Sequence, residues 1–134
     1  MTPEKDLLLS VKQQLKKTQV PVFDLGEQRS SKFPQIIVYL QNEQEIETLK
    51  QMDCIKVTVA VDVYENIEKQ GTVLDIGCKV ANLMQTLTTH EWGVQYQDSS
   101  MRPLVDNSLQ SQTLYRLAYL FDFLIYGKST VTKN

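Results

Sequence analysis

Few of the side chains in this sequence of 134 residues are suited to metal binding or nucleophilic chemistry. It contains one histidine, His90, and two cysteines, Cys54 and Cys78. A zinc site needs three or four N, S or O ligands at suitable positions, and these three residues lack the close spacing of such a set. Two isolated cysteines are usually buried small side chains rather than a bridge or a nucleophile. We therefore expect no metal site and two buried thiols, in a chain made and folded in a reducing cytoplasm.

The sequence also lacks an excess of positive charge and any long apolar segment. Fourteen basic residues against sixteen acidic ones give a net charge of −2, whereas proteins that bind nucleic-acid grooves usually carry a clear basic excess. No stretch approaches the roughly 20 apolar residues of a membrane helix. Residues 1–6 carry acidic side chains where a secretory signal has a basic start and then an apolar run. The hydrophobic share of 42% is that of an ordinary folded domain.

Two segments have the apolar period of an amphipathic helix. In residues 3–18 the apolar side chains recur at helical spacing. Thr2 is suited to the N-cap, and Asp6 in the first turn suits the helix dipole. A second helix is predicted over residues 72–88. Gly77 lies inside it at a cost of about 1 kcal/mol relative to alanine, which we interpret as a place of close packing against a sheet.

Five segments are rich in β-branched or aromatic residues and are predicted to be strands. They are residues 20–23, 35–40, 54–64, 92–96 and 113–126. In the third, every second residue is Ile or Val, which predicts one core face. Its other face is expected to meet solvent or a partner, and comprises Lys56, Thr58, Ala60 and Asp62. The last segment is apolar on one face and half apolar on the other, which predicts a central strand or a partner contact.

The segments between these elements are polar and are predicted to be loops. They cover residues 24–33, 41–53 and 97–109. The simplest fold that buries both helical stripes and the apolar strand faces is α+β, a mostly antiparallel twisted sheet of about four to five strands with two helices packed on one face. We expect residues 1–127 to form a single domain and residues 128–134 a flexible C-terminal tail.

The catalytic motifs nearest to this sequence are incomplete. His90 and Glu91 begin like the zinc-binding motif HExxH, but Val94 stands where the second histidine is required. Gly71 and Lys79 resemble part of a phosphate-binding loop, but the spacing differs and the segment is helical. We therefore expect no catalytic, cofactor-binding or metal-binding residues, no cofactor, and a protein that is not an enzyme.

Charged residues in the polar segments remain as candidates for binding. Three glutamates alternate in the acidic segment 41–53, namely Glu43, Glu45 and Glu47. Such a segment is most often simply solvated, and its functional alternative is an acidic lining in an oligomer. Four cations are candidates for contacts with a partner or another copy: Arg29, Lys32, Arg102 and Arg116.

The order and lengths of the segments resemble the tail completion proteins of long-tailed bacteriophages (siphoviruses), which comprise the tail terminators and the tail-to-head joining proteins. The resemblance covers residues 3–126 and is closest to the tail-to-head joining type. It rests on the helix that ends at Lys16-Lys17-Thr18 and on four later segments. These are the strand that begins Pro34-Gln-Ile-Ile-Val-Tyr, the valine-rich strand 55–63, the helix 73–87 and the aromatic strand that begins at Leu114.

The resemblance implies an α+β structural protein without enzymatic activity. It implies a ring, expected to be a hexamer, that joins the tail to the DNA-filled head, caps the tail tube and continues the DNA exit channel. The implied partners are further copies, a head connector or stopper protein and the tail tube protein, with DNA only as passing cargo and no membrane. The implied location is the head–tail interface of the virion.

Two hypotheses about residues follow from that role. The three glutamates line the channel, where negative charge repels DNA phosphates. The four cations make ring or partner contacts, together with loops 24–33 and 97–109, which order on docking. The alternative interpretations are a small ligand-binding or regulatory α+β module and, third, an enzyme with a nuclease-like or hydrolytic fold.

Overall fold

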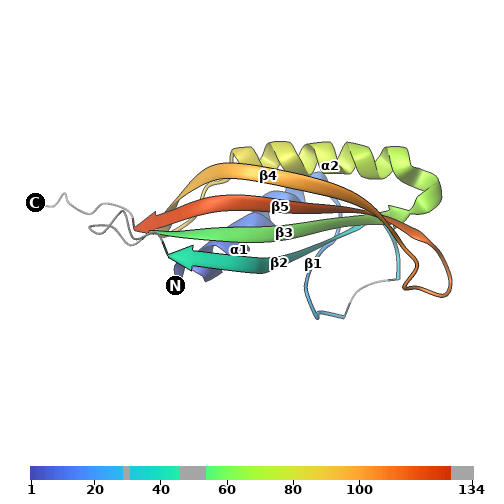
Figure 1. Ribbon diagram of the computed structural model, residues 1–134, viewed down its shortest axis with the longest axis horizontal. Coiled ribbons are helices and arrows are strands. Elements are labelled where there is room, and N and C mark those ends of the chain that lie inside the picture. Colours follow the sequence, from blue (N-terminus) through green and yellow to red (C-terminus); the bar gives the residue numbers. More distant parts are fainter. Residues whose placement is uncertain (29–30, 46–53, 128–134) are drawn as a thin grey trace, which may run out of the picture.

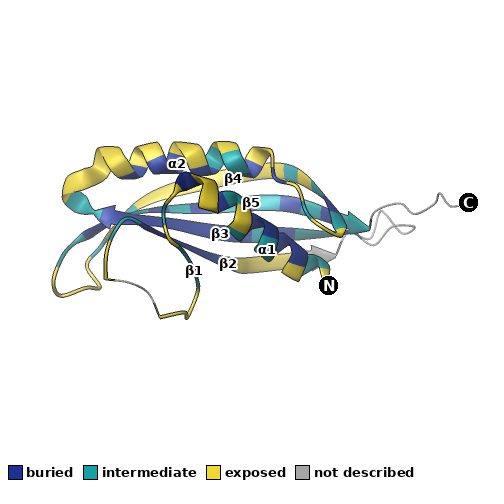
Figure 2. Ribbon diagram, turned by 180° about the vertical axis from the view of Figure 1, so that it is seen from behind, coloured by how far each residue is buried: buried dark blue, intermediate teal, exposed yellow. Residues whose placement is uncertain are grey.

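The computed structural model describes residues 1–28, 31–45 and 54–127, which form one sheet with two helices on one face (Figures 1 and 2). The helical elements are α1 (Pro3–Leu15), η1 (Lys16–Thr18), η2 (Ile67–Lys69) and α2 (Gln70–Gln85). The strands are β1 (Val22–Asp24), β2 (Gln35–Glu45), β3 (Cys54–Asn66), β4 (Trp92–Asp106) and β5 (Leu114–Gly127). The predicted α+β fold and element order are confirmed. No helix in the described part of the chain is long and apolar enough to cross a membrane.

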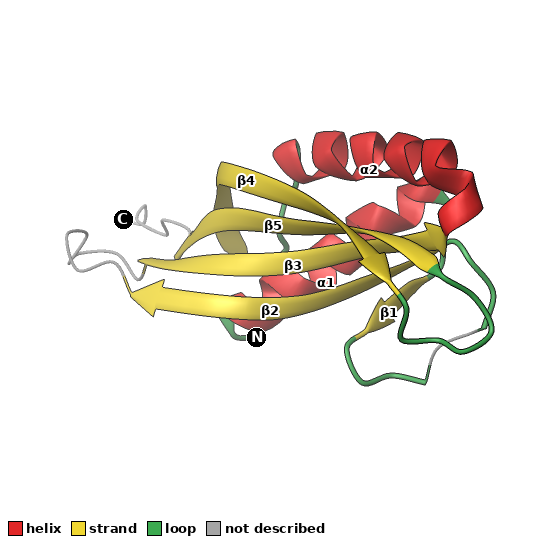
Figure 3. Ribbon diagram, turned by 45° about the vertical axis from the view of Figure 1, so that its right-hand side comes forward, coloured by secondary structure: helices red, strands yellow, loops and turns green. Residues whose placement is uncertain are grey.

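The five strands lie in the order β1-β2-β3-β5-β4. The short strand β1 runs parallel to β2, and every other neighbouring pair is antiparallel. The sheet is strongly twisted, as Figure 3 shows. β5 lies between β3 and β4, so the prediction of a central strand is confirmed.

Helix α1 begins and ends as its sequence dictates. The Thr2 hydroxyl accepts a hydrogen bond from the backbone N–H of Lys5 at 3.1 Å, and Pro3 occupies the first helical position. The helix tightens into η1 and stops at Gln19, whose φ of 65° is left-handed. The predicted helix 3–18 is therefore found as α1 followed by η1.

The core lies between the helices and one face of the sheet. The alternating valines of β3 and the aromatic face of β5 are buried there against α1 and α2. Gly77 of α2 is a point of close approach to the sheet, because a Cβ atom there would lie 2.6 Å from the Tyr119 hydroxyl and 2.7 Å from Leu117 Cδ1. The predicted close packing at this glycine is confirmed.

Two polar segments predicted to be loops form strand in the described residues. Residues 41–45 continue β2, and residues 97–106 continue β4 along the whole length of β5. The prediction failed because a strand paired on one side and solvated elsewhere needs backbone partners rather than an apolar period. Residues 46–53 and the predicted tail 128–134 lie outside the described residues.

Two burial predictions are also wrong. On the second face of β3, Lys56 and Thr58 are partly exposed, but Ala60 and Asp62 are buried, at 1% and 4% exposure. Ala60 lies in register between the larger residues Tyr39 and Leu120, and Asp62 is held by Arg116. Cys54 is buried as expected, whereas Cys78 is exposed, because it lies on the outer side of α2.

Candidate functional site

The face of the sheet opposite the helices, which we call the uncovered face, carries a row of charged side chains. The strand register shows which charged residues lie on this face. They are the cations Lys56, Arg102 and Arg116 and the acids Asp62, Asp98, Asp106 and Asp122. Asp122 accepts a hydrogen bond from the Thr58 hydroxyl at 2.6 Å and lies 3.9 Å from the Lys56 ammonium. Since the charges nearly balance, this face does not form a basic patch.

The most buried ion pair of this face joins Asp62 and Arg116. The guanidinium donates to the Asp62 carboxylate at 3.0 Å and lies over the Tyr64 ring, 5.7 Å from its centroid. Burial raises the pKa of Asp62, and the charge of Arg116 offsets only part of that effect. Burial likewise raises the pKa of Tyr39 beside this pair.

A hollow of about 390 Å³ lies above this ion pair, beneath the chain that follows β1. Its walls are the Asp62–Arg116 pair, Tyr39 and Tyr64, and residues 24–27. The Arg116 Nε atom is buried there and has no hydrogen-bond partner in the described structure. The chemistry of this hollow is charge pairing, because the Asp62 carboxylate is already held by a guanidinium and the residues described in its walls include no serine, cysteine or histidine.

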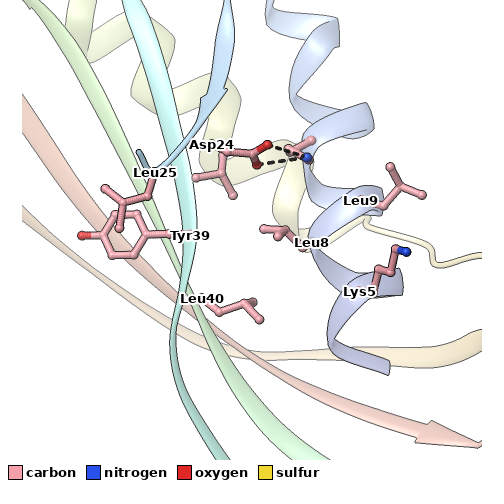
Figure 4. Close-up of a pocket in the computed structure, with 9 residues that line it drawn as sticks. Lys5, Leu8, Leu9, Asp24, Leu25, Tyr39 and Leu40 are labelled. Carbon is pink, nitrogen blue, oxygen red and sulfur yellow. Dashed lines mark hydrogen bonds and ion pairs between the residues drawn. The ribbon is translucent and has the colours of Figure 1, made fainter. Parts of the chain in front are cut away.

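A second, more apolar groove of about 460 Å³ runs between α1 and β2 (Figure 4). Leu8 and Leu9 of α1 form one wall, and Leu40 of β2 lies across from them. One end is closed by Leu25 and Asp24, whose carboxylate is paired with Lys12 of α1 at 3.0 Å. On its β2 side the groove is lined by Val38, Tyr39 and Leu40, at the point where the pairing of β2 with β1 ends.

Serine, histidine and aspartate meet at the start of α1, a cluster that the sequence analysis missed. Ser10 Oγ and Asp6 Oδ1 each lie 3.2 Å from His90 Nδ1, and 3.2 Å from each other. A catalytic triad places the serine on one ring nitrogen and the acid on the other. Here both contact the same nitrogen, so the cluster does not have the geometry of a triad.

The role of Asp6 in that cluster is structural. Its fully buried carboxylate accepts three consecutive backbone N–H groups, from His90 at 2.9 Å, Glu91 at 2.7 Å and Trp92 at 2.9 Å. Burial alone would raise the pKa of Asp6, but these hydrogen bonds outweigh it and lower the pKa from 3.8 to about 2. The carboxylate thereby fastens α1 to the start of β4.

The structure does not bring Glu43, one of the predicted acidic residues, to the uncovered face. Glu43 is exposed and pairs in register with Val57, a core-facing residue, so its side chain lies on the helix side. A hydrogen bond with Glu4 of α1, followed by burial and the charge of Glu4, raises the pKa of Glu43. Glu45 is the last residue of β2, and Glu47 lies outside the described residues. Their channel-lining role stays a prediction.

Two of the four predicted cations, Arg102 and Arg116, share the uncovered face. Arg102 is exposed on β4, and Lys32 is exposed before β2. Arg116 is held by Asp62 as described, and Arg29 lies outside the described residues. Within residues 1–28, 31–45 and 54–127, no group of three or more His, Cys, Asp or Glu side chains is placed to hold a metal ion.

The fold and these surfaces define an α+β domain whose sheet has one helix-covered and one uncovered face. No protein-family model and no curated protein matches the chain. Among solved structures, a chain in the virion of a native gene transfer agent particle has a TM-score of 0.63 and 14% sequence identity, covering 92% of this chain and 96% of that one. At this level of identity the similarity shows a shared fold.

Proposed function

We propose that this chain is a structural protein of a phage-like virion that joins the tail to the DNA-filled head as a ring. The observation that carries the proposal is the shared fold with a chain of a gene transfer agent virion, because it extends over nearly the full length of both chains. The resemblance of the element order to tail completion proteins supports the same role and adds the head–tail interface.

The geometry of the chain is consistent with a role in assembly rather than catalysis. In the described residues, the buried carboxylates of Asp6 and Asp62 are held by partners within the chain, Asp6 by backbone N–H groups and Asp62 by Arg116. The features left for partners are extended surfaces, namely the uncovered face, the sheet edges and the groove beside α1. In this proposal the chain has no enzymatic activity and DNA only passes through the ring.

The proposal is tested by removing the chain from particles that encode it. Without the protein, electron microscopy should show filled heads and separate tails, and a copy supplied in trans should restore joined particles. A matched control supplies a variant with the exposed substitution Asp75→Asn, which should restore joining as well as the natural chain. Tails that join filled heads efficiently without the protein would refute the proposed function.

A further inference from the structure

Both edges of the sheet are open in the described structure, and they are open at the same level. We call two residues level when the register pairs connect them straight across the sheet. β1 pairs only with residues 36–38 of β2, so residues 39–45 pair with β3 on one side and have no described strand on their outer side. Level with this stretch, on the opposite edge, lie residues 94–100 of β4. The two edges therefore expose matching lengths of backbone.

Proline marks where the β4 edge is unsuited to pairing. Pro103 cannot donate a backbone hydrogen bond, and it is level with Ile36, which lies where β1 covers β2. The stretch 94–100 contains no proline. Each edge also has one irregularity, between Leu40 and Asn42 and between Tyr96 and Asp98, at nearly the same level. Because such irregularities bend a strand, the two edges bend at similar heights.

Strand direction fits a contact between copies that share one orientation. From β2 to β4 the four strands alternate in direction. A second copy placed beside the first in the same orientation brings its β4 antiparallel to the first copy's β2. The sheet then continues without a break in the alternation. Such a contact is head to tail, which is the kind that closes into a ring.

The groove between α1 and β2 provides space for the side chains of the added strand. Ser99 lies on the helix side of β4, level with Leu40, and Met101 on the same side is exposed in the single chain. Beside β2 of another copy, this part of β4 lies next to the groove, which Leu40 and the α1 residue Leu8 line. Backbone hydrogen bonds along the edge and apolar contacts in the groove then act together, as in other strand-addition complexes.

We propose that residues 94–100 of β4 in one copy pair with residues 39–45 of β2 in the next, with Ser99 beside the groove along α1. The closure of this contact into a ring rests on the proposed function, whereas the pairing of the two strands is argued from the sheet edges alone. The bulkier helix layer takes the larger radius, so the uncovered face lines the channel. At about 4.8 Å between strands, four strands span about 19 Å, and a ring of about six copies is about 37 Å across at the sheet backbone.

Disulfide cross-linking between two variants that each carry one introduced cysteine tests this interface. Both variants carry Cys78→Ser, which removes the exposed thiol; one adds Leu40→Cys and the other Ser99→Cys. These positions are level, on the helix side of opposite edges, and opposed residues of an antiparallel pair have the Cα separation that a disulfide requires. Cross-links should form in the mixture at high concentration or in particles, but in neither variant alone.

Matched controls identify the surface. Mixing Leu40→Cys with Gln85→Cys, an exposed position on α2, should give no cross-link. Leu8→Lys in the groove wall should weaken self-association by about tenfold or more, and circular dichroism and a melting curve verify that this variant folds. The exposed substitution Leu74→Lys, on α2, should leave association unchanged.

The outcomes separate this inference from the proposed function. Rings without a Leu40–Ser99 cross-link, or linkage of Ser99→Cys with itself, would overturn the edge contact and leave a head–tail role standing. No cross-link in either purified protein or particles would also overturn it. Conversely, a Leu40–Ser99 cross-link in particles that contain the variants would support the contact. If tails also joined heads efficiently in separate particles that lack the protein, the proposed function would be refuted while the contact stood.

Discussion

Replacing Asp6 with asparagine should destabilise the fold by about 3 kcal/mol, although the change removes only one charge and no volume. The carboxylate accepts from three backbone N–H groups, with one oxygen on His90 and the other on Glu91 and Trp92. An amide has a single acceptor oxygen, so in either rotamer at least one of these N–H groups faces an NH₂ group. Each buried donor left without an acceptor costs about 1–3 kcal/mol.

The pKa of Asp6 gives an independent estimate of the charged part of this effect. Hydrogen bonding holds the pKa at about 2 against an ordinary value of 3.8, and such a difference corresponds to about 2 kcal/mol. Because the folded-state pKa is lowered, this stability is fully present above pH 3.8. It is lost as the pH falls through 3.8 toward 2, where the folded carboxylate also takes up a proton.

Urea denaturation at a series of pH values measures both quantities. The free energy of unfolding of Asp6→Asn should lie about 3 kcal/mol below that of the natural chain near neutral pH, and the gap should shrink between pH 4 and 2. Asp75→Asn removes an equal charge from an exposed site of α2 and should cost less than about 0.5 kcal/mol. A gap that stays constant across this pH range would refute the assignment of Asp6 as the ionised anchor of α1.

Three further predictions concern the packing, the buried ion pair and the acidic strand end. Gly77→Ala should destabilise the fold by about 1–2 kcal/mol in thermal melts, since its Cβ would overlap buried side chains. Gly71→Ala on the same helix meets nothing within 4 Å and should stabilise by about 0.5–1 kcal/mol. Because burial raises the folded pKa of Asp62, stability should fall as pH rises from 3.8 through that pKa, and Asp62→Asn should lack this slope in pH titrations of unfolding. Glu43→Gln should leave the rate of DNA delivery unchanged, since the proposed ring puts this residue on its outer side. Slower delivery, or DNA that stays in the particle, would restore the channel-lining hypothesis.

Local sequence patterns predict much of the fold. The helical stripes of α1 and α2 and the alternation along β3 predict both their type and the face that they bury. The predictions fail where a strand is defined by its neighbour. The second half of β4 has no apolar period, and it is a strand because β5 supplies backbone partners along its whole length. Sequence alone does not carry that information.

The candidate surfaces were less accessible to sequence reasoning than the core. Asp6 was interpreted as a partner of the helix dipole, and its main contacts lie 84 to 86 residues away in the chain. The glutamates of the segment 41–53 were interpreted as part of one loop. Once residues 41–45 are strand, alternation and the irregularity after Leu40 decide the side on which Glu43 lies. A single inserted residue reverses that assignment.

The charge of the uncovered face provides a final prediction about how DNA passes through the proposed ring. Three cations and four aspartates share this face, so a ring lined by it does not accumulate the phosphate contacts that make DNA binding tight. Ser100 lies on this face of β4 and is exposed. Ser100→Lys adds one cation per copy, repeated around the ring, and should slow DNA ejection. Ser100 is the last residue of the stretch proposed to pair between copies, but that pairing uses the backbone and its side chain lies on the uncovered face, so particles should remain joined. Added salt should restore the rate, since phosphate contacts weaken with ionic strength. Ser100→Asp adds one negative charge per copy in place of one positive charge, and particles with this variant should eject DNA as fast as those with the natural chain. Equal ejection by all three would mean that this face does not line the channel.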